Sequence, residues 1–397
     1  METINTGLNG VPVCESGISV ATADADGKPI LVYRGYSIYD LVKGLFEETA
    51  YLLLNGELPN SEQLKSFDKT LKENRHLDKR VAEHLKTYPI NVNRMDFLFT
   101  ALSFARMYDE DYNNPLWQNS KADAMAFSRL IKTTGVRIGA KIPTIIAYGH
   151  RILNGKEPIP PDNNLSCAAN FLHMMGIDAD GTASKALDTT LTLYLDHTMN
   201  NSTFISRVAA SARPDPYGPF IAAGVGLKGV LHGGANEMAS HMFDEIKSAA
   251  KVEHYVLERM ERGDVVFGFG HRLSAYKTGV ESRVIISEGI ARELAAAKKA
   301  AELMNIYDKL KQTMMSEKVE ERKRRTPNLD LPVAVIYKVL GIPVEWNTPI
   351  FQASRHFGWV AHMAEQCVEK GPLYRPAQKD IFAGVDNLKK YRPVEAR

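Results

Sequence analysis

The sequence predicts a mainly all-α fold with one small β-hairpin near the N-terminus. Apolar residues recur with a helical period along most of the chain, whereas only one pair of strand-like runs flanks a tight-turn signal. Strands that alternate with helices, as in a doubly wound α/β sheet, are not visible, and no repeat of fixed length indicates a solenoid. With 397 residues and 44% hydrophobic composition, the chain can form a large buried core in two or three domains.

The hairpin is predicted between residues 18 and 33. Ile18–Val20 and Ile30–Tyr33 are rich in β-branched and aromatic residues. Between them lies Asp26-Gly27, a dipeptide that supplies the positive φ of a tight turn.

Helices are predicted from residue 38 onward. The first covers residues 38–53, because Ser37 and Asp40 have capping-box spacing at its start and Asn55-Gly56 is a stop signal at its end. The same 3.6-residue period predicts further helices at Leu64–Leu71, Met95–Met107, Met125–Ile138, Leu187–Leu195, Met238–Ile246 and Ile285–Leu303.

Composition narrows the class of protein. A net charge of +2 gives no global attraction to nucleic acid or to an anionic membrane, and no apolar run is long enough to cross a bilayer. The three cysteines are too far apart for a disulfide framework or a zinc motif. Without a signal-peptide layout, the chain is expected to be soluble and intracellular, cytoplasmic by default, or in an organellar matrix if a presequence has been removed.

A glycine motif leaves one alternative open. Gly224 to Gly229 fits G-x-G-x-x-G, the dinucleotide-binding pattern, which requires a strand before the glycines and a helix after them. The preceding residues 220–223 are few and Ala-rich. An NAD(P)-linked oxidoreductase is therefore a distant alternative.

Two histidines follow glycine-rich loops. His232 precedes a predicted helix, whose dipole disfavours imidazolium and makes a neutral hydrogen-bond donor; a capping or packing histidine is the alternative. His271 follows Gly268 and Gly270, which let the backbone approach a ligand closely, and the adjacent Arg272 suits a phosphate or carboxylate. A plain turn is the alternative for either loop.

Asp330 lies just before a predicted helix whose first residue is Pro332. The helix dipole there favours the carboxylate, a proton acceptor, although aspartate at such a position often serves only as a cap. Arg355 and Arg375 are candidate carboxylate clamps, and the basic run 322–325 suits phosphates or forms a solvated helix end.

Taken together, these motifs resemble the citrate synthase family over nearly the whole chain. The segments that carry the resemblance are, in chain order, Tyr33–Tyr36, Tyr51–Pro59, Asp196–Phe204, Leu231–Glu237, Gly268–Arg272, Pro327–Asp330, Thr348–Arg355, Gly358–His362 and Arg375-Pro376.

The resemblance implies a two-domain helical homodimer. A large domain would comprise residues 1–231 and 336–397, and a small, mobile domain on the coenzyme A side would comprise residues 232–335. The implied reaction is a Claisen-type condensation of an acyl-CoA with oxaloacetate, followed by hydrolysis of the thioester. Citrate synthase is the first choice, and a 2-methylcitrate or longer alkylcitrate synthase is the alternative.

The family's residue roles carry over onto matching positions. Asp330 would remove a proton from the acyl-CoA, neutral His232 would hydrogen-bond the enol oxygen, and His271 would protonate the oxaloacetate carbonyl. Oxaloacetate would be held by His197, Arg283, Arg355 and Arg375, and coenzyme A by Gly268, Gly270, Arg322, Arg324 and Arg325. No metal and no permanently bound cofactor are expected, since the coenzyme A thioester is a co-substrate.

One segment departs from the family pattern. After Gly-His the family reads close to Arg-Val-Tyr-Lys-x-x-Asp-Pro-Arg, but the corresponding run here, residues 272–283, is longer and lacks Asp-Pro, so Arg283 is the nearest equivalent of the last arginine. The departure leaves open an acyl donor other than acetyl-CoA and a non-catalytic CoA-binding homologue.

Overall fold

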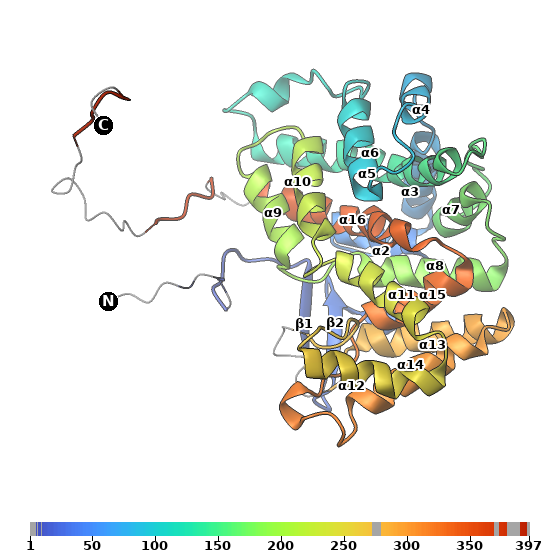
Figure 1. The fold of residues 1–397 in the computed structure, drawn as a ribbon. Helices are drawn as coiled ribbons and strands as arrows, with labels where there is room; N and C mark the ends of the chain where they lie inside the picture. Colours follow the sequence, from blue (N-terminus) through green and yellow to red (C-terminus); the bar gives the residue numbers. More distant parts are fainter. Residues whose placement is uncertain are drawn as a thin grey trace.

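Helices dominate the molecule (Figure 1). The computed structural model describes residues 5, 7–8, 10–271, 279–368, 373–378 and 390–394, apart from the side chain of Arg322. In this part of the chain the strands form one small antiparallel sheet in the order β1-β2-β3. The prediction of a mainly all-α fold is therefore confirmed. None of the helices in these ranges has the length and apolar character needed to span a bilayer.

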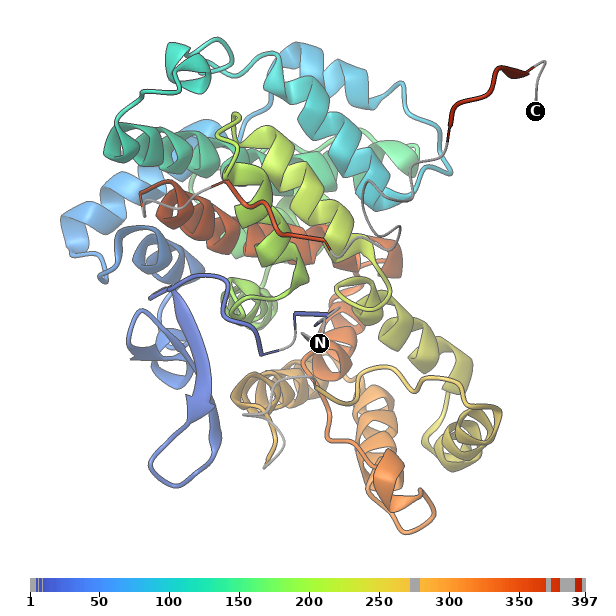
Figure 2. The same ribbon diagram turned by 90° about the vertical axis from the view of Figure 1, so that its left-hand side faces the viewer.

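The N-terminal sheet contains the predicted hairpin. Strands β1 (Ser19–Ala23) and β2 (Pro29–Tyr33) pair with Ser19 opposite Tyr33, and Gly27 has the positive φ of 77° that the turn requires. A third strand, β3 (Tyr36–Ser37), was not predicted. Figure 2 shows the hairpin extending along one edge of the helical body.

The helices follow in chain order. Their bounds are α1 (Ile38–Leu41), α2 (Phe46–Asn55), α3 (Ser61–Asn74), α4 (Lys79–Leu85), α5 (Arg94–Arg106), η1 (Pro115–Gln118), α6 (Ala124–Leu153), α7 (Cys167–Met175), α8 (Gly181–Tyr194), α9 (Asn201–Ala210), α10 (Tyr217–Lys228), α11 (Gly234–Ile246), η2 (Ala249–Lys251), α12 (Val252–Arg262), α13 (Ser282–Ala297), α14 (Ala301–Met314), η4 (Glu321–Lys323), α15 (Asp330–Leu340), η5 (Val344–Trp346) and α16 (Asn347–Val368).

The core is built around α6 and α16, which pack against each other along their lengths; Figure 1 shows α16 crossing the middle of the molecule. Two glycines of α6 permit the close approach. A Cβ on Gly135 would lie 2.6 Å from Val360 Cγ2, and one on Gly139 would lie 2.7 Å from Phe357 Cζ. Side chains larger than hydrogen at these two positions would force the helices apart.

Two predicted helices are interrupted. The helix expected over residues 38–53 stops at Leu41, where Lys43 N and Gly44 N donate to Asp40 O and Leu41 O in turn-type hydrogen bonds that do not continue the α-helical pattern. A second helix then starts at Phe46, where Glu48 Oε1 accepts a hydrogen bond from the Leu45 backbone. The helix expected over 285–303 likewise breaks at residues 298–300, where Lys299 has a φ of 58°.

The G-x-G-x-x-G motif lies inside a helix. Gly224 and Gly226 belong to α10, and the element directly before α10 is the helix α9 and not a strand. A Cβ on Gly224 would lie 2.5 Å from Gln352 Oε1, and one on Gly226 would lie 2.5 Å from Ile205 Cδ1. These glycines therefore serve helix packing, and the strand-turn-helix geometry of a dinucleotide site is absent here.

The expected division into two domains stays a prediction. Helices α12, α13 and α14 lie together at the lower end of the view in Figure 1. Helix α15 packs on α11, α13 and α14 and also on α8. A boundary after residue 335 would therefore fall inside a helix that contacts both parts.

Candidate active site

Six of the predicted site residues come together from six different elements. His197 follows α8, His232 lies between α10 and α11, His271 follows α12, Arg283 is in the first turn of α13, Asp330 begins α15, and Arg355 is in α16. Charge interactions connect His197 with Arg283, His271, Arg355 and His232, and Asp330 with Arg283.

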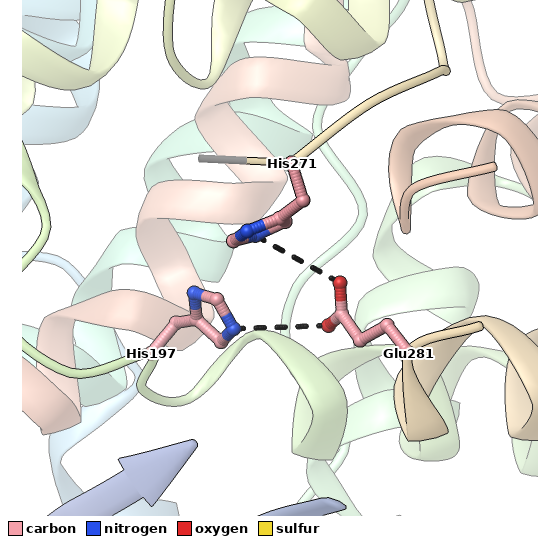
Figure 3. A group of neighbouring side chains, drawn as sticks. All are labelled: His197, His271 and Glu281. Carbon is pink, nitrogen blue, oxygen red and sulfur yellow. Dashed lines mark ion pairs between the residues drawn. The ribbon is translucent and has the colours of Figure 1, made fainter. Parts of the chain in front are cut away.

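A glutamate joins two of the histidines (Figure 3). His197 Nε2 lies 3.7 Å from Glu281 Oε1, and His271 Nε2 lies 3.9 Å from Glu281 Oε2. The two imidazole rings are 5.1 Å apart between centroids. Glu281 is only 2% exposed, and its Oε1 also accepts a hydrogen bond from Arg283 Nε. The sequence analysis gave Glu281 no role.

The spacing of this cluster raises the question of a metal ion. One ligand atom from each of His197, His271 and Glu281 lies within 4.8 Å of the others. However, Arg283 already donates to the carboxylate, and Arg355 is close enough to affect His197 electrostatically. A cation would be placed beside guanidinium groups, so the surroundings favour an anionic ligand.

Burial keeps both histidines neutral. It lowers the pKa of His197 well below its usual value, and the positive charge of Arg283 acts in the same direction. Burial also lowers the pKa of His271 to about 4, although the Glu281 carboxylate opposes the shift. At neutral pH each ring therefore has one donor and one acceptor nitrogen.

His232 is held in the turn between α10 and α11. Its backbone N donates to Gly229 O at 2.9 Å, and its Nε2 lies 2.8 Å from Ser202 Oγ. Burial, assisted by Arg355, lowers the pKa of His232 to about 3. The neutral state expected from the helix dipole is thus produced mainly by desolvation.

Asp330 begins α15 but does not cap it. Its backbone N donates to Asn328 Oδ1, and among the described residues its own carboxylate accepts no hydrogen bond from the first turn of the helix, so the capping alternative is wrong. Pro332 is the third residue of α15 instead of the first.

The charge state of Asp330 also differs from the expectation. Burial raises the pKa of Asp330 to about 7; it outweighs the opposing effect of Arg283, and the Glu281 carboxylate raises the pKa further. The Tyr194 hydroxyl has no hydrogen bond of ordinary geometry but lies near enough to lower this pKa. The helix dipole alone would favour the carboxylate; desolvation is stronger here. A carboxyl with a pKa near neutrality is suited to accept and return a proton.

The loops that precede His271 and Asp330 are joined by backbone hydrogen bonds. Gly270 N donates to Thr326 O at 2.8 Å, Asn328 N donates to Gly268 O at 2.9 Å, and Asn328 Nδ2 donates to Gly270 O at 3.1 Å. Gly268 and Gly270 have φ values of 81° and 86°, which only glycine adopts readily. This pairing brings two predicted catalytic residues, far apart in sequence, to one side of the site.

Arg355 supplies a buried cation. It is 1% exposed, its Nε donates to Tyr194 O at 2.7 Å, and its guanidinium stacks 4.8 Å from the Phe351 ring centroid. Burial lowers its pKa to about 10. Its Nη1 is buried and has no hydrogen-bond partner in the described part of the chain, which is costly unless a ligand supplies one.

The remaining predicted residues lie apart from this cluster or cannot be placed. Arg375 is exposed on the extended segment 373–378, and it makes no hydrogen bond or ion pair with the described residues; the neighbouring Tyr374 packs on Phe204 of α9. Arg324 Nε donates to Val319 O, and Arg325 is exposed beside Gly270. The side chain of Arg322 and the whole of Arg272 lie outside the described residues.

Comparison with known proteins decides the family. The family model described as citrate synthase, C-terminal domain, matches residues 7–377. The chain belongs to the citrate synthase family.

Proteins that are similar to this chain include enzymes named for two different products, citrate and 2-methylcitrate. The chain is 36% identical to 2-methylcitrate synthase 1 of Corynebacterium glutamicum, over 94% of each chain, and 36% identical to a citrate synthase of Synechocystis, over 100% of this chain and 94% of that one. It also resembles the citrate synthase of Thermoplasma acidophilum solved in a ternary complex with carboxymethyl coenzyme A and oxaloacetate, with 28% identity, complete coverage of both chains and a TM-score of 0.85. The family is thus established, whereas equal identity to the first two leaves the acyl donor undecided.

Proposed function

We propose that this protein condenses an acyl-CoA with oxaloacetate and hydrolyses the resulting thioester, releasing coenzyme A and citrate or an alkyl-substituted citrate. The observation that supports this most is the meeting, in one buried site, of a carboxyl whose pKa is about 7 with neutral imidazoles and guanidinium groups. A carbanion-forming condensation with a dicarboxylate needs these three kinds of group.

Asp330 acts as the base in this proposal. It removes an α-proton from the acyl-CoA while neutral His232 donates a hydrogen bond to the thioester oxygen, which becomes the enol oxygen. The α-carbon then attacks the keto carbon of oxaloacetate, and His271 donates a proton to the keto oxygen as the new carbon–carbon bond forms. Water finally cleaves the thioester. None of these steps requires a metal ion or a permanently bound cofactor.

Oxaloacetate is placed between His197, Arg283 and Arg355. The unpaired Nη1 of Arg355 is positioned to bind a substrate carboxylate, because guanidinium and carboxylate form strong charge-assisted hydrogen bonds. Arg375 is exposed, so its predicted role requires either another chain or a movement that brings it to the substrate.

Coenzyme A is placed on the side of residues 268–270 and 322–325. The loop at Gly268 and Gly270 lies beside Arg325, and the basic residues Arg322, Arg324 and Arg325 suit the phosphates of coenzyme A. We further propose that residues 232–335 close over the substrates and that the protein works as a homodimer. Its intracellular location stays a prediction, and the comparisons give no support to an organellar one.

The decisive experiment measures free thiol release from the purified protein. Oxaloacetate is combined with acetyl-, propionyl-, butyryl- or hexanoyl-CoA, and the variant Asp330→Asn is tested with each donor. The matched control is Asp308→Asn, which changes an exposed aspartate of α14 that pairs with Arg292 of α13. We expect oxaloacetate-dependent release that is lost in D330N and retained in D308N. The donor that gives the fastest thiol release separates citrate synthase, our first choice, from 2-methylcitrate or longer alkylcitrate synthase. The donor series is needed because an apolar pocket distinguishes acyl chains that differ by one methylene by only ~1–3 kcal/mol, so small changes in its wall can switch the preference.

Two other outcomes would redirect the assignment. Coenzyme A binding without thiol release from any donor would indicate a non-catalytic homologue. Binding of a nicotinamide cofactor would reopen the oxidoreductase alternative, which the helical position of Gly224 and Gly226 disfavours.

A further inference from the structure

Glu281 occupies the centre of the proposed oxaloacetate site. Its Oε1 accepts from Arg283 Nε and lies 3.7 Å from His197 Nε2, while its Oε2 faces His271 Nε2 at 3.9 Å (Figure 3). Oε2 is buried and has no hydrogen-bond partner among the described residues. A buried carboxylate is costly unless it is paired, and the pairing with Arg283 offsets this cost for Glu281.

The backbone around Glu281 is anchored independently of its side chain. Glu281 is the N-cap residue of α13, but its carboxylate makes no capping hydrogen bond. The next residue, Ser282, instead accepts a hydrogen bond from Leu31 N of β2 through its Oγ. The helix start is thus tied to the sheet by Ser282, and the Glu281 carboxylate, which makes no capping bond, contacts Arg283, His197 and His271.

We propose that Glu281 is a positioning residue for oxaloacetate, which holds the guanidinium of Arg283 through its Nε and sets the charge around His271 and Asp330. This inference rests on the proposed function. A guanidinium held at Nε has a fixed plane, and a fixed plane reduces the entropy lost when the group binds a substrate carboxylate. Glu281 itself need not touch the substrate.

The charge effect is supported by the surrounding titratable groups. Those that face Glu281 are His197 from the α8–α9 loop, His271 from the loop after α12, Arg283 from α13 and Asp330 from α15. The carboxylate raises the pKa of both His271 and Asp330, so removing its charge should lower both pKa values. For a base that must be deprotonated, a lower pKa moves the acid limb of the rate profile to lower pH.

Glu281→Gln tests the proposal because it keeps the shape and removes the charge. The matched control is Glu288→Gln on the same helix, where the glutamate pairs with Arg292 and Lys311 away from the site. In E281Q the amide oxygen can still accept from Arg283 Nε, but the hydrogen bond is no longer between two charged groups. We therefore expect Arg283 to be held less firmly and the KM for oxaloacetate to rise roughly tenfold, with the KM for acyl-CoA within about twofold of wild type. The acid limb of kcat/KM for acyl-CoA should also move to lower pH. E288Q should change neither quantity.

Glu281→Asp separates geometry from charge. It keeps the carboxylate but withdraws it by one methylene, so the acid limb should stay at the wild-type pH while the KM for oxaloacetate rises several-fold, less than in E281Q. If circular dichroism shows that E281Q does not fold, E281D becomes the test. A KM for oxaloacetate in E281D equal to that of the wild-type protein would then overturn the proposal. E281Q kinetics equal to those of E288Q would overturn it as well. Failure of the wild-type protein to release thiol would instead overturn the proposed function, and calorimetric titration of oxaloacetate into wild type and E281Q would still test positioning.

Discussion

Replacing Gly268 by alanine should destabilise the protein more than the same change at Gly270, although the two glycines have nearly the same backbone conformation. Their φ values are 81° and 86°. An alanine at either position therefore bears a similar left-handed strain of ~1–2 kcal/mol. The surroundings differ. A Cβ on Gly268 would lie 2.8 Å from both Cβ and Cδ1 of Leu331, whereas the nearest atom to a Cβ on Gly270 would be Arg325 Cδ at 3.5 Å.

The difference between the two variants isolates the clash with Leu331. Rotating the Leu331 side chain could move Cδ1 away, but its Cβ is fixed to the backbone of α15, so the loop or the helix start must shift. Overpacking of this kind costs ~1–3 kcal/mol. We therefore expect a loss of ~1–2 kcal/mol for G270A and ~2–5 kcal/mol for G268A.

Urea unfolding followed by circular dichroism measures both values on the same protein preparation. The free energies should be compared only if the two variants unfold with the same m-value as wild type. Because Leu331 directly follows Asp330, G268A should also lose more activity than G270A. Equal unfolding free energies for G268A and G270A would refute the clash and, with it, the close packing of this loop on α15.

Three further predictions concern charged groups. The kcat/KM for acyl-CoA should rise with pH through about 7, since the pKa of Asp330 is raised to about 7 and only the deprotonated form is a base; a profile flat from pH 5 to 8 would contradict this. Arg355→Lys should weaken oxaloacetate binding roughly ten- to hundredfold in calorimetry, because a lysine cannot both donate to Tyr194 O and bind the carboxylate in a forked geometry. Asp188→Asn should be more stable than wild type at pH 8 but not at pH 4. Burial and the neighbouring Glu47 raise the pKa of Asp188 to about 7, so the folded wild-type protein loses stability as pH rises from about 4 to about 7, by at most ~4 kcal/mol.

The controls for these predictions use the same assays. The Asp188→Asn substitution keeps an oxygen that can accept from Phe46 N, so the difference from wild type reports the charge and not a lost hydrogen bond. An advantage of D188N that is the same at pH 4 and pH 8 would show that the charge of Asp188 is not responsible. Arg355→Lys should leave the KM for acyl-CoA within about twofold of wild type, and an equal rise in both KM values would point to a general loss of structure.

The sequence was sufficient to predict the helical fold but not where helices break. Periodicity in apolar residues identifies a buried face, which continues across an interruption such as residues 42–45. At this break Lys43 N and Gly44 N make turn-type hydrogen bonds to Asp40 O and Leu41 O, and Glu48 creates a new helix start by accepting from Leu45 N. These local hydrogen bonds have similar energies, so spacing alone could not rank them.

Site residues could be predicted from the sequence where the residue type stands out from its local pattern. His232 and His271 stand beside glycines, and Asp330 stands at a helix start, so each attracts attention in the sequence. Glu281 does not, because a glutamate near arginine is usually a solvated ion pair and only the fold shows that it is buried. The helix dipole predicted a lowered pKa for Asp330, but the pKa is raised, because the desolvation that raises it depends on the surrounding chain and cannot be read from the local sequence.

The hydrogen bonds between residues 268–270 and 326–328 have a consequence for folding. They close a loop of chain that contains α13 and α14, so His271 and Asp330 meet only after both of these helices have found their places. Contacts between residues so distant in sequence form late and slowly. Catalytic competence should therefore return after most of the helical signal during refolding.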